Sequence, residues 1–306
     1  MRAPIIGSRG SDLALWQANH VKDLLGGQSE ILVIKTRGDR IQHLSLDKVE
    51  GKGFFTKEIE ESLQSKAIDV AVHSYKDLPT EPPPGLVLAG VPPRAPVADI
   101  LVRRKRADSH ERPWNLAEGA QIGTSSIRRK AQLLSLRPDL KMVDIRGNVP
   151  TRFNKVLEGE LDAVILAEAG LSRLGYFDPE HPCHEGVVLE RLDIVDACPA
   201  PAQGALAIQV RADDQATRQL VEQLTCHSTA LAVEAERWLL RYFGGGCHLP
   251  LGAFCSQQHG QLELQASVTS PDGTTRLRAN ASGSSPEEIA TQVYEDLTRQ
   301  GAKRFL

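Results

Sequence analysis

The chain has 306 residues, which is too long for one compact core and short for more than three domains. Hydrophobic residues make up 41% and charged residues 25%, the ordinary balance of a folded globular protein. The net charge of −3 gives no overall field that attracts nucleic acid or a membrane, and no apolar run reaches membrane-spanning length. We therefore expect a cytoplasmic protein with no nucleic-acid or membrane partner.

Five cysteines are scattered along the chain without a Cys-x-x-Cys pair: Cys183, Cys198, Cys226, Cys247 and Cys255. An odd, unpaired set is not a disulfide framework and suits a reducing compartment. Two groupings could suggest zinc: His181 with Cys183 and His184, and Cys247-His248 with Cys255 and His259. Neither has the paired short spacing of structural zinc sites, so we expect no metal.

The first part of the chain alternates β-rich runs with amphipathic segments. The expected order is strand 3–7, helix 12–25, strand 31–35, helix 56–64 and strand 69–74. Ser11 is suited to cap the first helix, because its hydroxyl can accept a bond from a free backbone N–H of the first turn. This β-α-β-α-β order favours a largely parallel, doubly wound sheet.

Proline clusters at 79–84 and 92–96 then interrupt the pattern, and the second indicates an interdomain hinge. A second α/β unit follows, with strands at 121–123, 142–145 and 163–167 and helices at 126–137 and 150–157. Pro199 and Pro201 mark another crossing. The strand expected at 205–210 could return to the first sheet, so that two strands would join the two domains.

The last part of the chain differs in character. A helix is expected over 227–243, followed by alternating runs at 250–255, 261–268 and 274–281 and by a final helix capped at Ser285. We predict an α/β protein with two doubly wound domains and a small C-terminal α+β domain. The predicted boundaries are 1–94 with 200–222 for the first domain, 98–198 for the second and 227–306 for the third.

Three glycines, Gly244 to Gly246, directly precede Cys247. Glycines permit positive φ and leave room beside the sulfur. A core cysteine would gain nothing from such a bare approach, so we interpret this thiol as one arranged to be reached or modified.

A second motif, 123–129, lies where a strand turns into a helix. Thr124, Ser125 and Ser126 offer caps and donors at the positive end of the helix dipole. Arg128 and Arg129 add guanidinium donors suited to carboxylates or phosphates. Taken alone, the motif is equally compatible with a capped helix and two solvated arginines.

Arginines follow the next strands as well: Arg146, Arg152 and Arg173. Ligands of parallel α/β sheets collect beyond the carboxyl ends of strands, so we expect these five arginines to converge on one polyanionic small ligand. At the equivalent strand end of the first domain, Lys76 precedes Asp77, which would stay ionised and could stabilise a developing cation. A surface Lys–Asp pair in a turn is the simpler alternative.

The sequence resembles the porphobilinogen deaminase (hydroxymethylbilane synthase) family nearly from end to end. The resemblance is carried by these segments: 9–11 with 13–18, 36–39, 51–55, 72–79, 123–129, 146–148 with Arg152, 203–205 and 245–247. It implies two domains like periplasmic binding proteins and a third that carries a covalent dipyrromethane on Cys247 as a thioether. It also implies a cytoplasmic monomer that joins four porphobilinogen molecules into hydroxymethylbilane with loss of ammonia.

The resemblance implies roles for the residues singled out above. The residues expected to hold the carboxylates of the cofactor and the growing chain are Ser74, Lys76, Thr124, Ser125, Ser126, Arg128, Arg129, Arg146, Arg152 and Arg173. Asp77 would bond pyrrole N–H groups and stabilise the azafulvenium-type cation, with Lys76, Arg9 and Ser11 completing the substrate end of the site. Residues 51–55 would form a lid that excludes water.

Three positions depart from the family pattern: Tyr75, Ala202 where a glycine is usual, and Gly244. None removes a catalytic group. A non-enzymatic anion-binding protein of the same bilobed fold would explain the arginines but has no use for the thiol or the lid. A cysteine hydrolase using Cys247 and His248 is disfavoured, because neighbouring side chains on a strand point to opposite faces.

Overall fold

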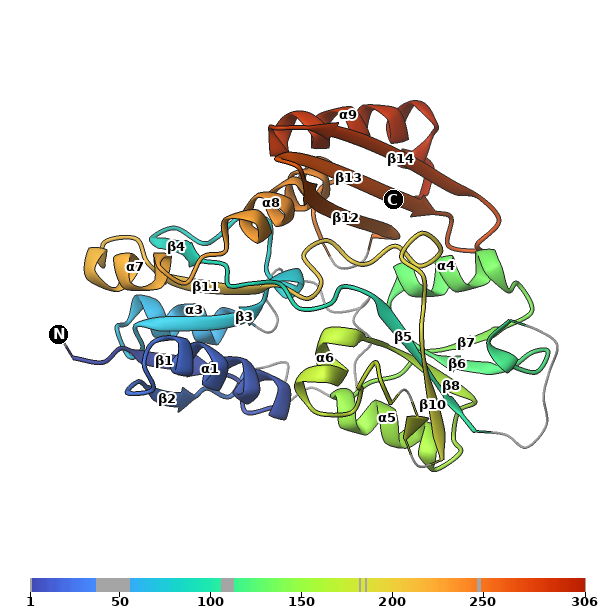
Figure 1. Ribbon diagram of the computed structural model, residues 1–306, viewed down its shortest axis with the longest axis horizontal. Coiled ribbons are helices and arrows are strands. Elements are labelled where there is room, and N and C mark those ends of the chain that lie inside the picture. Colours follow the sequence, from blue (N-terminus) through green and yellow to red (C-terminus); the bar gives the residue numbers. More distant parts are fainter. Residues whose placement is uncertain are drawn as a thin grey trace.

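The computed structural model describes residues 2–36, 56–105, 113–181, 183–184, 186–246 and 249–305. The described residues form three sheets, of five, six and three strands. Two α/β lobes lie side by side, and the third sheet with its helices lies across them (Figure 1). The predicted fold class is therefore confirmed.

The first sheet has the order β2 (Glu30–Val33), β1 (Ile5–Ser8), β3 (Val70–Ser74), β11 (Leu206–Arg211), β4 (Leu86–Gly90). Its helices are α1 (Asp12–Leu24), α3 (Lys57–Gln64) and α7 (Gln215–Glu222). Ser11 caps α1 as predicted, since its side chain accepts a bond from the Ala14 backbone N–H at 3.4 Å. β11 returns to this sheet as predicted, but it lies antiparallel between β3 and β4. The sheet is thus mixed, and our prediction of a largely parallel sheet in the first domain is wrong, because both pairings of β11 are antiparallel.

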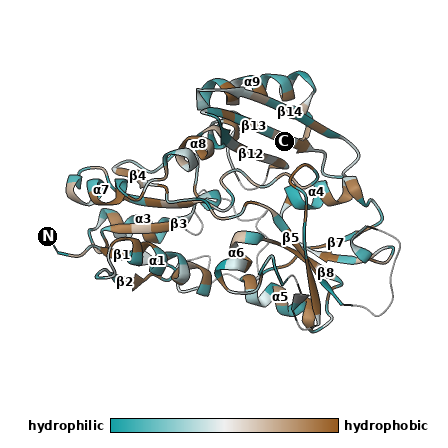
Figure 2. Ribbon diagram, viewed as in Figure 1, coloured by the Kyte–Doolittle hydropathy of each residue, from teal (hydrophilic) through white to brown (hydrophobic). Residues whose placement is uncertain are grey.

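The second sheet has the order β7 (Lys141–Val143), β6 (Gln121–Gly123), β8 (Ala163–Ala167), β5 (Asp99–Arg104), β10 (Val187–Arg191), β9 (Cys183–His184). Its helices are α4 (Ile127–Leu136), α5 (Val149–Leu157) and α6 (Glu168–Arg173), and a short 3-10 turn, η3, spans Pro113–Asn115. β5 runs antiparallel to β8 and β10. The residues 70–72 of β3, 100–102 of β5 and 163–167 of β8 are hydrophobic runs, as expected for strands covered on both faces (Figure 2).

The third domain packs α8 (His227–Tyr242) and α9 (Pro286–Arg299) on the antiparallel sheet β12 (Leu251–Gln258), β13 (Gln261–Thr269), β14 (Arg276–Gly283). A last 3-10 turn, η4, spans Ala302–Phe305. Ser285 caps α9 as predicted, accepting a bond from the Glu288 backbone N–H at 3.3 Å. Among the described residues, no helix combines the length and the apolar character that crossing a membrane requires.

Helix α8 holds the two chain crossings between the lobes. Glu236 of α8 is fully buried and receives both terminal nitrogens of Arg94, at 2.6 and 2.9 Å. The same carboxylate accepts the backbone N–H groups of Ala202 and Cys255, at 2.6 and 2.8 Å. Arg94 belongs to the first crossing and Ala202 to the second, so one buried carboxylate ties both crossings to the third domain.

Ala202 has a φ of +63°, the left-handed conformation that glycine adopts most easily. This conformation explains why glycine is usual at this position in the family that the sequence resembles. Gly204, two residues on, has a φ of +87°, and a Cβ there would lie 2.4 Å from the carbonyl oxygen of Ala95. The second crossing is thus a tight backbone turn pressed against the first.

Candidate functional site

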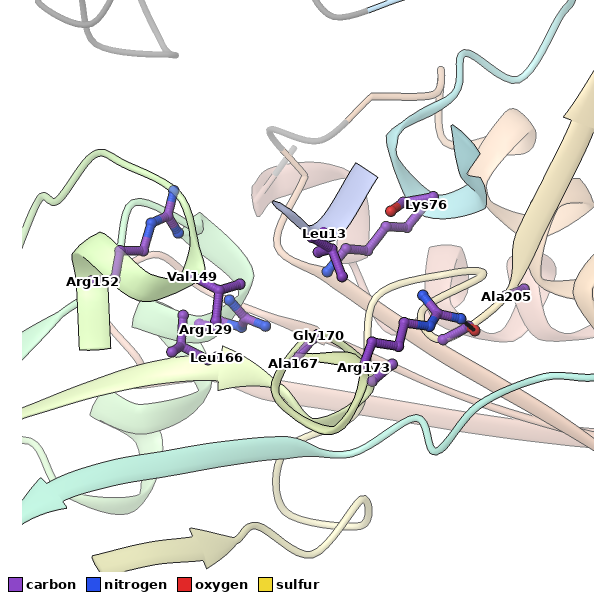
Figure 3. A pocket seen from close by; sticks show the side chains of 13 residues that line it. Leu13, Lys76, Arg129, Val149, Arg152, Leu166, Ala167, Gly170, Arg173 and Ala205 are labelled. Atoms are coloured by element: carbon purple, nitrogen blue, oxygen red, sulfur yellow. Dashed lines mark hydrogen bonds between the residues drawn. The ribbon is translucent and has the colours of Figure 1, made fainter. Parts of the chain in front are cut away.

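Two adjoining pockets share Leu13 and Ser74: the first lies between the two α/β lobes, and the second is lined by residues of the first lobe alone. The polar side chains around the first pocket come from both lobes: Ser74, Lys76, Arg129, Arg152 and Arg173. Figure 3 shows Lys76 on one side of this pocket, Arg129 and Arg152 on the other, and Arg173 at one end. The polar residues of the second pocket are Arg9, Ser11, Gln17, Thr56, His73, Ser74 and Asp77.

Lys76 and Asp77 lie in the short 3-10 turn η2 (Tyr75–Asp77), directly after β3. The third domain holds this turn in place through Arg237 of α8. Its guanidinium donates to the carbonyl oxygens of Tyr75, Leu78 and Pro79, at 3.4, 3.3 and 2.5 Å. The same guanidinium lies over the Tyr75 ring, 4.4 Å from its centroid. The position of Lys76 and Asp77 therefore depends on an arginine 160 residues further along the chain, which no local pattern indicates.

Lys76 points into the first pocket, and its ammonium donates to the side-chain oxygen of Gln203 at 3.2 Å. Burial lowers the pKa of Lys76 to about 8, and the neighbouring Arg129 acts in the same direction. The carboxylates of Asp77 and Asp99 oppose this decrease in the pKa. Lys76 is thus a half-buried cation whose charge would be favoured by a further anion in the pocket.

Arg152 and Arg173 are two further cations of the first pocket whose pKa is lowered by burial. Their guanidinium groups donate to backbone carbonyls, Arg152 to Gly147 and Arg173 to Gly204, each at 2.8 Å. Within the described ranges, neither forms a salt bridge with a carboxylate. Burial lowers the pKa of each to about 10, and for Arg152 the cations Arg129 and Arg146 add to the effect. Both remain charged at neutral pH, so the pocket contains partly desolvated cations that lack a counter-ion.

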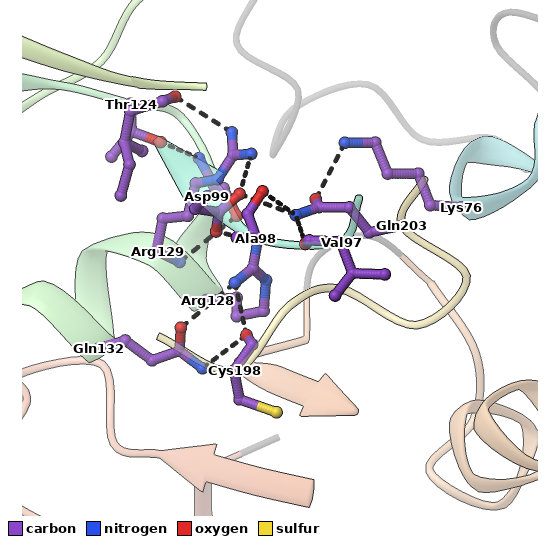
Figure 4. A network of polar contacts seen from close by, with 12 residues as sticks. Lys76, Val97, Ala98, Asp99, Thr124, Arg128, Arg129, Gln132, Cys198 and Gln203 are labelled. Atoms are coloured by element: carbon purple, nitrogen blue, oxygen red, sulfur yellow. Dashed lines mark hydrogen bonds and ion pairs between the residues drawn. The ribbon is translucent and has the colours of Figure 1, made fainter. Parts of the chain in front are cut away.

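Arg128 and Arg129 differ from these two, because the protein itself provides their counter-ion (Figure 4). Asp99, the first residue of β5, accepts Arg128 at 2.9 Å and Arg129 at 2.6 Å. Burial acts to raise the pKa of Asp99, but the two arginines outweigh it and hold that pKa far below the usual range. Arg128 also donates to Gln132 and to the Cys198 carbonyl, at 3.2 and 2.6 Å. Arg129 still lines the first pocket, whereas Arg128 is not among the lining residues of either pocket.

The three hydroxyl residues before α4 also have internal partners. Ser126 caps the helix by accepting the Arg129 N–H at 3.4 Å, and Thr124 accepts the Ser126 N–H at 3.2 Å. Ser125 Oγ donates to the Ile145 carbonyl at 2.5 Å and accepts the Ile145 N–H at 3.1 Å. None of the three lines the two pockets, although all were predicted to contact the ligand.

The comparisons with known proteins decide the family. Residues 5–219 match the family model described as "Porphobilinogen deaminase, dipyromethane cofactor binding domain", and residues 230–299 match "Porphobilinogen deaminase, C-terminal domain". The chain belongs to the porphobilinogen deaminase family. A "Porphobilinogen deaminase" of Trichlorobacter lovleyi is 45% identical over 308 residues, covering 98% of this chain and 95% of that protein. One of Brevibacillus brevis is 43% identical over 303 residues, covering 97% and 94%.

Solved structures with a similar arrangement have low sequence identity. The BvgS VFT2 domain of Bordetella pertussis, a double mutant, is 14% identical, covers 77% of this chain and 92% of its own, and has a TM-score of 0.44. The periplasmic arginine-binding protein STM4351 of Salmonella typhimurium is 15% identical, covers 75% and 94%, and has a TM-score of 0.40. The assignment of the fold rests on the topology described above.

Cys247, the thiol that the sequence predicts to carry the cofactor, lies outside the described residues, as do His248 and the predicted lid at 51–55. The glycines before it are described, with φ values of +92°, +67° and +128° for Gly244, Gly245 and Gly246. Their positive φ confirms the sequence prediction. A Cβ on Gly245 would lie 2.9 Å from the Thr80 hydroxyl, so the glycine turn packs three residues beyond Asp77.

Two residues behind the first pocket, Asp99 and Gln203, were given no role from the sequence, although Gln203 lies in a segment that carries the family resemblance. Gln203 donates to the Val97 carbonyl at 2.7 Å and to Asp99 at 2.9 Å while it accepts Lys76. It therefore connects the Lys76 ammonium with the counter-ion of the two arginines, across both crossings (Figure 4). The available signal was a single charged residue, Asp99, directly before the buried run 100–102.

Proposed function

We propose that the protein is a transferase of tetrapyrrole biosynthesis, which leads to porphyrins and heme. It condenses four porphobilinogen molecules head to tail into hydroxymethylbilane, with loss of ammonia. The observation that carries this proposal is that one pocket holds Lys76 together with Arg152 and Arg173, two partly buried cations that form no salt bridge with a described residue. Each porphobilinogen carries an acetate and a propionate, so this pocket matches the charge of the substrate and of its oligomers.

We propose that a dipyrromethane attached to the Cys247 sulfur as a thioether is the cofactor. The pocket fits such a group, because its carboxylates would provide the counter-ions that the cations lack. The residues that would hold it are Ser74, Lys76, Asp77, Arg129, Arg152 and Arg173, with Arg128, Arg146, Thr124, Ser125 and Ser126 supporting that wall. When bound, the cofactor supplies the pyrrole carbon from which the chain of rings grows.

Asp77 would provide the negative charge that stabilises the cation formed in the reaction. It lies in the second pocket, where its carboxylate would accept pyrrole N–H groups and stabilise the substrate-derived cation as ammonia leaves. Lys76 would hold a substrate carboxylate, and Arg9 and Ser11 would bind at the same end of the site. A lid over 51–55 would keep water from that cation.

We propose that the first domain comprises 1–94 with 200–222, the second 98–198 and the third 227–306. We also propose that the protein is cytoplasmic and monomeric. The chain charge of −3 and the unpaired cysteines support a cytoplasmic enzyme that acts on a small molecule.

Intact-protein mass spectrometry tests the proposal directly. The purified active protein should be heavier than its sequence mass by one dipyrromethane. Cys247→Ser should lose both the added mass and the turnover of porphobilinogen, whereas Cys226→Ser, a matched change at a partly exposed thiol, should keep both. An active protein with the bare sequence mass would overturn the cofactor assignment, and a protein that binds porphobilinogen without turnover would identify an anion-binding protein instead.

A further inference from the structure

We propose that Gln17 is a positioning residue of the cleft: its amide orients the hydroxyl of Ser74 so that this hydroxyl donates to a carboxylate of the bound pyrrole. The inference rests on the proposed function, because it takes the ligand to be a pyrrole with carboxylate side chains. Gln17 itself need not touch the ligand.

The geometry places Ser74 at the centre of the site. Ser74 is the last residue of β3 and lines both pockets, directly before the turn that carries Lys76 and Asp77. Gln17 lies on α1, is only 3% exposed, and its side-chain Nε2 donates to Ser74 Oγ at 2.8 Å. This short bond joins the first helix of the chain to the strand end where the chemistry would occur.

The hydrogen-bond inventory of the hydroxyl then determines what Ser74 can offer. A serine hydroxyl has one hydrogen to donate and two lone pairs to accept with. Gln17 occupies a lone pair, and in the part of the chain that the structure describes no group accepts the hydrogen of Ser74. The hydroxyl therefore has its donor left for the pocket, where Lys76, Arg129 and Arg152 attract an anion. A carboxylate oxygen in that field is the acceptor it would meet.

Packing alone does not explain an amide at position 17. The buried face of α1 consists of Gln17, Ala18 and Val21, so two of its three members are apolar. A buried amide is costly unless it is hydrogen-bonded, and an apolar side chain of similar length would avoid that cost. The bond to Ser74 is thus what the amide contributes to this face.

A double-mutant cycle on the full-length, cofactor-loaded protein tests the coupling of these two residues. Ser74→Ala should raise the KM for porphobilinogen about 10-fold, the loss expected for one hydrogen bond to a charged group. Gln17→Met should raise it about 3- to 10-fold in the wild-type background and by less than about 1.5-fold in the Ser74→Ala background. Changes in kcat should be small, because the interaction exists before the chemical step.

Gln17→Glu provides the sharper variant, because a carboxylate can only accept. It would take the Ser74 hydrogen for itself and its negative charge would repel the ligand's carboxylate, so the KM should rise about 30-fold or more, exceeding the effect of Gln17→Met. Asn19→Met is the matched control, since Asn19 is an exposed amide of the same helix that donates to the Leu15 carbonyl at 2.9 Å. It should leave the KM unchanged.

Thermal unfolding of each variant shows that it folds, and if Gln17→Met does not, the cycle is run with Gln17→Leu, which also removes the bond without making another. Additive effects of the two substitutions on KM, or a Gln17→Glu protein with wild-type KM, would overturn the role of Gln17 while leaving the proposed function intact. A wild-type protein without turnover would overturn the proposed function, and this inference with it.

Discussion

Two aspartates of this protein differ in whether other protein groups compensate their charge. Asp99, buried at the start of β5, is bonded to Arg128, Arg129 and Gln203, so its charge is compensated within the protein. Asp77 lines the second pocket, and no described residue donates a hydrogen bond to its side chain. The arginines divide in the same way, since Arg128 forms a salt bridge with Asp99, whereas Arg152 forms none with a described residue. The charges that are compensated by protein groups stabilise the fold, whereas the others are those we propose to bind the ligand.

Neutralising each aspartate in turn tests this difference between them. Asp77→Asn should lower kcat about 10²- to 10³-fold, because the substrate-derived cation loses its stabilising charge, with little change in the free energy of unfolding. Asp99→Asn should instead lower the free energy of unfolding by about 3 to 5 kcal/mol, because it leaves buried arginines unpaired. Steady-state kinetics and urea unfolding measure the two effects. Normal turnover in Asp77→Asn would contradict its role.

The two arginines at helix starts provide a matched pair. Arg152→Gln should raise the KM for porphobilinogen about 10- to 100-fold and change the unfolding midpoint little, because among the described residues that guanidinium bonds only the Gly147 carbonyl and forms no salt bridge. Arg128→Gln should destabilise the protein by about 3 kcal/mol, since Asp99 loses part of its compensation. If both variants lost stability equally, the distinction between paired and unpaired cations would fail.

The pKa of Lys76 predicts a pH effect in a definite direction. With a pKa of about 8, lowered by burial and then by Arg129, Lys76 loses its charge above pH 8, and the KM for porphobilinogen should rise there. Between pH 8 and the ordinary value of 10.5 the unfolded chain binds more protons than the folded one, so stability contributed by this group rises with pH in that window. Lys76→Arg should move the rise in KM to higher pH. A KM profile identical to that of the wild type would exclude Lys76 as its cause.

A substitution at Ala202, in the second chain crossing between the lobes, should change the free energy of unfolding only slightly. Ala202→Gly should stabilise the protein by about 0.5 kcal/mol, because glycine adopts its φ of +63° without steric cost but has more freedom when unfolded. Gly204→Ala is the opposite control, since its Cβ would lie 2.4 Å from the Ala95 carbonyl oxygen. Chemical denaturation measures both, and a destabilised Ala202→Gly would show that the backbone strain is not the controlling factor.

Much of the local structure followed from the sequence alone. Strands β6 and β8 occupy the predicted residues, and the capping serines of α1, α4 and α9 lie where hydroxyls precede amphipathic runs. Gly244 to Gly246 adopt the positive φ that glycine permits. The motifs also indicated the family. Helix caps, strands and turns depend on residues that are close together in the chain, so the order of the residues predicts them.

Tertiary structure alone decided the rest. Strands β4, β5 and β10 and helices α6 and α7 were not predicted, and β11 inserts antiparallel into a sheet expected to be largely parallel. Arg128 and Arg152 look alike in the sequence, and only the position of Asp99, 29 residues before Arg128, separates them. Burial and long-range pairing determine which charges are compensated, and those quantities exist only once distant segments share a core.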